Sequence, residues 1–194
     1  MPKDTYELYS GNALQYYIVG RFAVFTNLRV AGNLLHHAVE MALKGHLSRS
    51  LSPANLKKLK HSLGKLWPSF KESVSTSGLE KHDTVISRLI PFETVRYPDH
   101  AAEHGARFLI SPGVAPKSHS KRLREKLPRS VPRYDIYLGD VDALLAAIFA
   151  AASINPKFFS QGLKEAALDY LTTDNPTDFW GSPRSVRTLA SEVD

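Results

Sequence analysis

Apolar residues recur at three- and four-residue spacing through one segment of this chain after another, and this periodicity constrains the fold most. Residues 29–48 carry the clearest example, a wide apolar stripe with His36, His37, Glu40 and Lys44 on the other side. Such a stripe is typical of a helix that buries one face against its neighbours. The sequence therefore predicts a protein built mainly of helices.

The same periodicity and the usual start and stop residues set the expected helix boundaries. The predicted helices are 10–26, 29–48, 53–66, 79–95, 140–153 and 155–172. Ser52-Pro53 and Asn155-Pro156 each place a capping residue before a proline at the first helical position. Pro68 is expected to mark a turn, and Pro91 is expected to kink the helix that contains it.

Residues 105–138 lack the helical pattern. Alternation in 107–110 and 133–138 suits two short strands, with Tyr134, Ile136 and Leu138 on one face. We therefore expect a basic loop or a small two-stranded arm inserted before the C-terminal helices. The predicted organisation is a single helical domain over 1–172, with 105–138 as its basic insertion. A C-terminal extension over 173–194 follows, in which Phe179 and Trp180 could dock on the body.

Composition excludes several classes of protein. The chain has no cysteine, so disulfides and thiolate zinc sites cannot form. Its longest run of small apolar residues, 143–152, is well short of the roughly 20 residues that a membrane span needs. The first residues show no apolar stretch of the kind found in secretory signals. We expect a soluble, cytoplasmic protein that does not interact with a membrane and needs no cofactor or metal.

Positive charge is concentrated in the middle of the chain. Residues 44–133 carry 18 Lys and Arg against 7 Asp and Glu, whereas residues 134–194 carry 4 against 9. The segment 117–133 could contact a nucleic-acid backbone, with Tyr134 and Tyr137 nearby for stacking on bases. A solvated surface loop is the alternative. The predicted nucleic-acid contacts are Lys121, Arg122, Arg124, Arg129 and Arg133.

The segment RYPDHAAEH, residues 96–104, is the predicted catalytic site. Pro98 should begin a short helix that Gly105 ends, with His100 and His104 on one face. Arg96 can hold a phosphate and a histidine can exchange protons near neutral pH, a pair sufficient for metal-independent RNA cleavage.

Two other interpretations of the same segment remain open. The string His-x-x-Glu-His also has the spacing of inverted zinc peptidases. Alternatively, Arg96 forms a structural salt bridge with Asp99. In the second helix, His36 and Glu40 are one turn apart and can pair, which favours a packed polar pair over a ligand site.

Several segments resemble the HEPN superfamily of helical domains. NLLHHAVEMALKGHL (33–47) is similar to its typical helix, LKKLKHSLGKL (56–66) to the leucine-rich helix that follows, and ISRLIPFETVRYPD (86–99) to the segment ending in an arginine–tyrosine junction. The helices near the C-terminus, VDALLAAIF and KEAALDYLTTDN, are compatible with the same pattern.

The resemblance implies an all-α antiparallel helical bundle, often a homodimer. Catalytic members are metal-independent ribonucleases of toxin–antitoxin and defence systems, with an arginine followed after four to six residues by a histidine. Here three residues separate Arg96 from His100 and seven separate it from His104. We therefore expect a non-catalytic module that binds RNA, a nucleotide or a protein partner. The alternative is a ribonuclease that uses Arg96 with His100 or His104.

Overall fold

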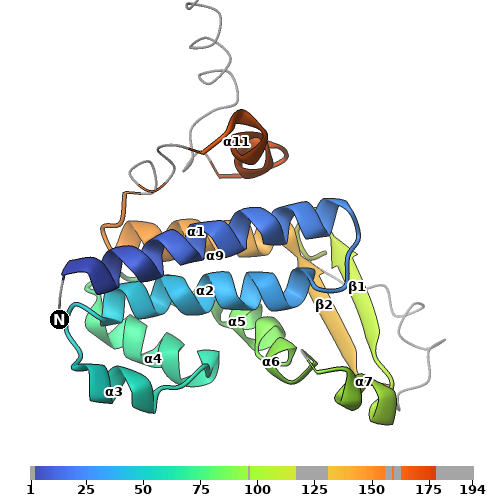
Figure 1. Cartoon of the computed structure of the whole chain (residues 1–194), viewed down its shortest axis with the longest axis horizontal. Coiled ribbons are helices and arrows are strands. Elements are labelled where there is room, and N and C mark those ends of the chain that lie inside the picture. The colour runs from blue at the N-terminus through green and yellow to red at the C-terminus, as the bar shows by residue number, and fades with distance from the viewer. Residues whose placement is uncertain (1–2, 96, 117–130, 156–158, 160–162, 178–194) are drawn as a thin grey trace, which may run out of the picture.

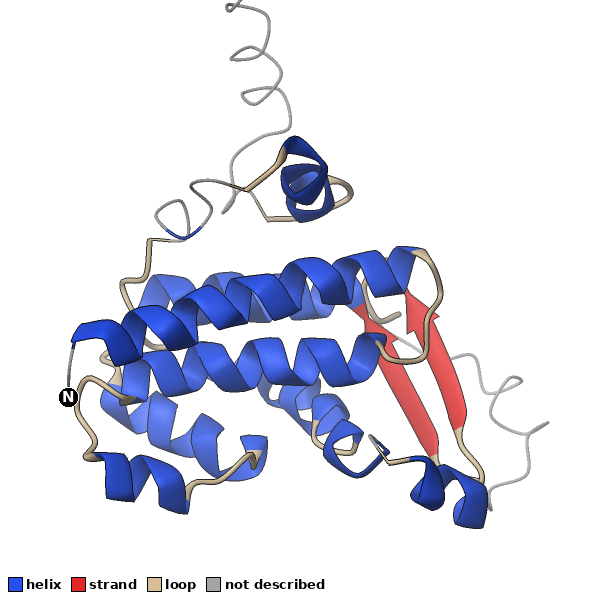
Figure 2. Cartoon of the chain, in the orientation of Figure 1, coloured by secondary structure: helices blue, strands red, loops and turns tan. Residues whose placement is uncertain are grey.

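The computed structural model of this chain describes residues 3–95, 97–116, 131–155, 159 and 163–177. Helices make up most of this part of the chain, and a small two-stranded sheet lies at one end of the helical body (Figure 1 and Figure 2). The prediction of a mainly helical protein with a two-stranded arm is therefore confirmed. None of the described helices is long and apolar enough to cross a membrane.

Two long helices, α1 (Lys3–Phe25) and α2 (Ala31–Leu47), lie side by side in the centre of the fold (Figure 1). The short turn between them makes them run in opposite directions. Their close approach depends on a glycine, because a Cβ atom at Gly20 would lie 2.7 Å from a methyl carbon of Leu35. The expected bounds of α2 are confirmed within two residues, whereas α1 begins earlier than the expected residue 10.

The predicted helix 53–66 is wrong in its extent. Two helices occupy this region, α3 (Pro53–Lys58) and α4 (Leu63–Ser73), with a turn between them. The chain turns at Lys60, whose φ of +53° lies in the left-handed region where a right-handed helix cannot continue. The buried leucines of this region therefore belong to two helices that pack into the same core.

Pro68 lies inside α4 and does not mark a turn, which corrects a second expectation. A proline in a helix removes one backbone hydrogen bond and crowds the preceding turn. The neighbouring side chains of Leu66, Trp67 and Phe70 are buried in the core, and their burial offsets that cost. Burial of these side chains therefore outweighs the unfavourable effect of a proline inside the helix.

The predicted helix 79–95 is divided into three short pieces. They are the 3₁₀ helix η1 (Leu79–His82), α5 (Asp83–Leu89) and α6 (Phe92–Val95). The break between α5 and α6 falls at Pro91, as its missing N–H predicts.

A short helix lies with the two strands at the sheet end of the molecule. The helix α7 (Pro98–His104) ends at Gly105, whose φ is +70°, as the sequence predicts. The strands β1 (Arg107–Ser111) and β2 (Arg133–Tyr137) pair in parallel, with Arg107 opposite Arg133. Both expected strands are therefore confirmed.

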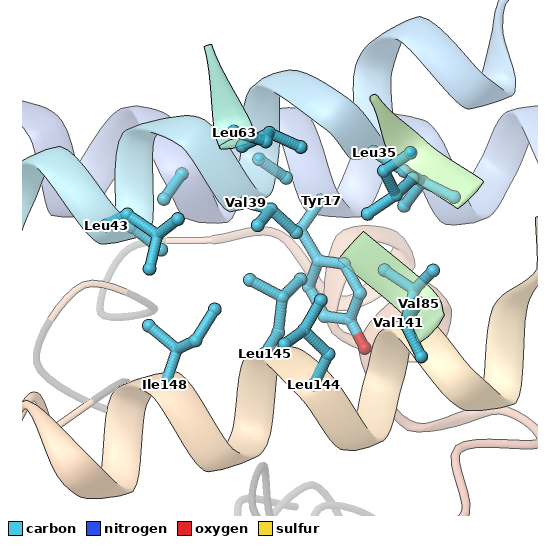
Figure 3. Packing of buried hydrophobic residues seen from close by; sticks show 14 of the residues in the cluster. Tyr17, Leu35, Val39, Leu43, Leu63, Val85, Val141, Leu144, Leu145 and Ile148 are labelled. Atoms are coloured by element: carbon cyan, nitrogen blue, oxygen red, sulfur yellow. The ribbon is translucent and has the colours of Figure 1, made fainter. Parts of the chain in front are cut away.

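The helix α9 (Leu138–Ala151) follows β2 without a break, so Leu138 is its first residue and does not belong to the strand face expected for it. Its apolar side chains Leu144, Leu145 and Ile148 point toward Tyr17 and residues of α2 (Figure 3). The hydrophobic core therefore lies between α9 and the pair of long helices.

The predicted helix 155–172 is also wrong in its extent. Lys164 has an extended backbone, with ψ of 154°, and α11 (Glu165–Thr172) begins only after it. Arg21 of α1 donates hydrogen bonds to the carbonyl oxygens of Tyr170 and Thr173 and forms a buried ion pair with Asp142 of α9. These contacts attach α11 to the helical body. Phe179 and Trp180 lie outside the described residues.

Candidate functional site

Most of the residues predicted to act on a ligand lie outside the described part of the chain. This holds for Arg96 and for the basic residues of the insertion, and only the backbone of His100 is described, on α7. The undescribed predicted site residues are Arg96, Lys121, Arg122, Arg124 and Arg129. Their predicted roles stay predictions.

The structure places His104 and Arg133 at the sheet end of the molecule. His104 ends α7, and its Nδ1 lies 3.7 Å from Glu103 Oε2. Arg133 begins β2, and its Nε donates to Asp135 Oδ1 at 2.6 Å. Each of these two side chains therefore contacts a carboxylate close to it in the sequence.

The expected aromatic contacts to bases are wrong, because Tyr134 and Tyr137 are buried. Tyr134 stacks on Phe108 of β1, with ring centroids 5.3 Å apart, and Arg88 lies over the Tyr137 ring. Both tyrosines therefore support the sheet.

A different set of titratable groups meets around Glu40, in the middle of α2. The Glu40 side chain is fully buried. Its Oε1 accepts hydrogen bonds from Lys44 Nζ at 2.7 Å and from His61 Nδ1 at 2.8 Å, and its Oε2 accepts one from His37 Nδ1 at 3.1 Å. We call Glu40, His37, Lys44 and His61 the Glu40 cluster.

The contacts of the Glu40 cluster fix its protonation. Burial by itself would raise the pKa of Glu40, but hydrogen bonds from His37 and Lys44, the Lys44 charge and the hydrogen bond from His61 lower that pKa to about 2. Glu40 is therefore ionised at neutral pH. Because an ionised carboxylate can only accept hydrogen bonds, the bonded Nδ1 atoms of both histidines carry a proton.

His36 contacts Glu40 less closely than the four-residue spacing between them predicts. Its Nδ1 lies 3.0 Å from the carbonyl oxygen of Leu89, whereas its Nε2 is 4.0 Å from Glu40 Oε2, beyond hydrogen-bond distance. Burial lowers the pKa of His36, so this ring is neutral and packs α2 against α5. The expectation that His36, Glu40 and Lys44 lie on the polar side of their helix is wrong, since all three are buried.

Local structure in and after α3 brings His61 to the cluster. The side chain of Ser52 caps α3 by accepting from the backbone N–H of Asn55 at 3.3 Å, and Pro53 occupies the first turn. The left-handed residue Lys60 then reverses the chain direction. As a result, the next residue, His61, reaches back to Glu40 on α2.

An open pocket of about 880 Å³ lies beside the Glu40 cluster, where α3 faces α1 and α2. In Figure 1, α3 is at the opposite end of the helical body from the sheet. The residues that line this lysine pocket are Thr5, Tyr9, Lys44, Pro53, Ala54, Leu56, Lys57, Lys58, Lys60 and His61. Four are lysines, and none of the described lining residues is Asp or Glu.

This arrangement suits a negatively charged ligand. Clustered ammonium groups attract anions, and lysine is a common phosphate ligand. Tyr9, Pro53 and Leu56 add an aromatic and apolar wall to the same pocket, whose size is in the range of ordinary small-molecule sites. Within the described residues, no group of three or more His, Cys, Asp or Glu is arranged to hold a metal ion.

Sequence reasoning did not place Lys57, Lys58, Lys60 and His61 in a site. In the sequence these lysines lie between the leucines of the predicted helix 53–66, and that spacing by itself does not indicate a ligand site. A usable signal was the spacing of Glu40 and Lys44, one turn apart on a helix rich in buried apolar residues. A carboxylate in such a place needs several hydrogen-bond donors, which must come from other elements.

Comparison of the chain with protein-family models, with curated proteins and with solved structures finds no match. The fold and site together define a helical body with a cationic pocket at one end.

Proposed function

We propose that this chain is a HEPN-like, antiparallel and non-catalytic helical module that binds RNA or a nucleotide through phosphate groups in the lysine pocket. The composition of the pocket carries this proposal, because four lysines and His61 line it without an acidic residue among the described lining. Lys57, Lys58 and Lys60 are exposed, so a ligand can reach their charges.

Lys44 differs from the other three lysines because it is buried and bonded to Glu40. Its charge is largely balanced, and it fixes one wall of the pocket. The exposed lysines therefore supply most of the attraction for an anion, and Tyr9 can stack on a base, as aromatic side chains do in single-strand binding proteins.

The HEPN resemblance further implies a homodimer or a partner protein, in a toxin–antitoxin or defence setting. The ribonuclease alternative, with Arg96 and His100 or His104, also stays a prediction, because Arg96 and the His100 side chain lie outside the described residues. The lysine pocket favours binding as the function to test first.

The test is the affinity of an oligouridylate, measured by fluorescence anisotropy at several salt concentrations. We expect wild-type affinity to fall as salt rises, since phosphate contacts release counterions. Replacing both Lys57 and Lys58 by glutamine should weaken binding about ten-fold and make the salt dependence shallower.

The matched control is the double variant Lys65→Gln with Lys81→Gln, which removes the same charge from two exposed lysines outside the lysine pocket. Equal affinities for the two double variants would contradict the proposal. A third variant, with Lys121, Arg122 and Arg124 neutralised, tests whether the basic insertion is the binding surface instead.

A further inference from the structure

His61 joins the buried Glu40 cluster to the surface of the lysine pocket. Its Nδ1 is bonded to the buried Glu40 carboxylate at 2.8 Å, yet 56% of its side chain is exposed. His61 also lines the lysine pocket, and its other ring nitrogen, Nε2, is not the atom bonded to Glu40. A ligand in the pocket therefore meets an exposed imidazole whose Nδ1 is already engaged.

Glu40 determines which nitrogen of His61 carries the proton in the neutral ring. An ionised carboxylate accepts hydrogen bonds and cannot donate them, so the Nδ1 of His61 must be the donor. The neutral ring then has only a lone pair at Nε2. Because the oxygens of a phosphodiester are also acceptors, neutral His61 and a phosphate cannot form a hydrogen bond through Nε2.

Protonation removes this conflict. An imidazolium donates from both nitrogens, so it can keep the bond to Glu40 through Nδ1 while it donates to a phosphate oxygen through Nε2. Such a charge-assisted hydrogen bond is stronger than a neutral one.

We propose that a phosphate bound in the lysine pocket takes up a proton at His61, so that phosphate affinity rises as the pH falls. This regulation rests on the proposed function and acts at the same pocket. The direction follows from linkage, because the ligand-bound state holds the extra proton and raising the pH favours the ligand-free state.

The titratable groups that bind His61 or line the lysine pocket with it come from three elements. α2 supplies Glu40 and Lys44, the α3 region supplies Lys57, Lys58 and Lys60, and α1 supplies Tyr9. Lysine and tyrosine side chains ordinarily titrate well above neutral pH, and a carboxylate ordinarily titrates well below it. His61 is the one imidazole among the described residues that line the lysine pocket, and only an imidazole gains a second donor nitrogen on protonation, which is why the proton is assigned to it.

His37 is the other histidine in the Glu40 cluster. It binds Oε2, the second oxygen of Glu40, and it is not among the residues that line the lysine pocket. A His37→Gln variant therefore distinguishes a proton held at the pocket from one held elsewhere in the cluster.

The test is the affinity of an oligouridylate with hydroxyl ends, whose charge is constant between about pH 5.5 and about pH 8. Wild-type affinity should fall about ten-fold as the pH rises through this range. The His61→Gln variant should show little pH dependence, while His37→Gln and His104→Gln should keep the wild-type dependence. Calorimetry in buffers of different ionisation enthalpy should show proton uptake in the wild type and none in His61→Gln.

A Glu40→Gln variant adds a second arm. A glutamine amide can donate to Nδ1, which allows the neutral ring to carry its proton on Nε2, so the pH dependence should become smaller. Wild-type binding without pH dependence, or the same dependence in His61→Gln, overturns proton uptake and leaves the proposed function in place. Absence of binding at every pH overturns both.

Discussion

Among the described residues, two carboxylates are fully buried in the helical body, and their surroundings differ. Asp142 on α9 is bonded to Arg21 and Tyr17, which are themselves fully buried. Glu40 on α2 is bonded to Lys44 and His61, which line an open pocket. A buried ion with buried partners holds helices together, whereas a buried ion with partners at a pocket can position groups that contact a ligand.

At the Asp142 site the hydrogen-bonding groups bind other groups of the protein. Arg21 donates to Asp142 and to two carbonyl oxygens at the end of α11, and Tyr17 donates to Asp142. Burial and the neighbouring Asp142 charge raise the pKa of Tyr17 far above its usual range, so its hydroxyl stays protonated. This site therefore ties α1, α9 and α11 together and offers nothing to a ligand.

The largest expected effect is the loss of Asp142. Replacing Asp142 by alanine leaves the Arg21 charge buried without its carboxylate, and we expect the free energy of unfolding to fall by about 3–5 kcal/mol. Urea unfolding measures this change. The control is Lys71→Ala, which removes a more exposed pair with Asp83 and should cost about 1 kcal/mol or less. Similar costs for the two variants would show that the Asp142 site is not a structural tie.

The second effect concerns the Glu40 cluster in acid. The pKa of Glu40 in the folded chain is about 2, below its ordinary value of 4.5. Its contribution to stability is therefore complete above about pH 4.5 and is lost as the pH falls toward 2, a change of about 3 kcal/mol. The free energy of unfolding, measured against pH, should fall less steeply in Glu40→Gln than in the wild type.

The matched control for this acid titration is Glu103→Gln, whose carboxylate is exposed on α7. This variant should follow the wild-type curve. If the free energy of unfolding of Glu40→Gln ran parallel to the wild-type curve over the same pH range, the ionised Glu40 carboxylate would not be stabilised by the cluster.

The smallest expected effect is on stability, and it distinguishes the lysine pocket from the Asp142 site. Lys57 and Lys58 are exposed on α3, so their replacement by glutamine should change the free energy of unfolding by about 0.5 kcal/mol or less. The same variant should lose phosphate affinity. A loss of stability as large as that of Asp142→Ala would instead assign these lysines to the fold.

The helices could be predicted where local pattern and packing agree. α2 has a continuous apolar stripe, and its bounds were predicted within two residues. Pro68 and Lys60 show the limit of local patterns. A proline is accepted inside α4 because aromatic neighbours are buried around it. After α3 the chain turns at Lys60, whose left-handed backbone its residue type does not predict.

The candidate site was harder to predict because its parts meet only in the folded chain. Glu40 lies on α2, and His61, 21 residues later, lies in the turn between α3 and α4. Their contact depends on the reversal at Lys60, which the leucine spacing of the region conceals. The division of the chain into a domain over 1–172 and an extension over 173–194 stays a prediction, although Asn175 in that extension donates to Tyr17 of α1.

The most direct test of a phosphate site in the lysine pocket is an NMR titration of the labelled protein with an oligouridylate. Backbone amide shifts should change at Thr5, Tyr9, Lys57 and His61, which line the pocket. The amides of Arg133 and its strand, at the sheet end, should stay in place. Shifts confined to the sheet end, or none at the pocket with ligand bound, would contradict the proposed site.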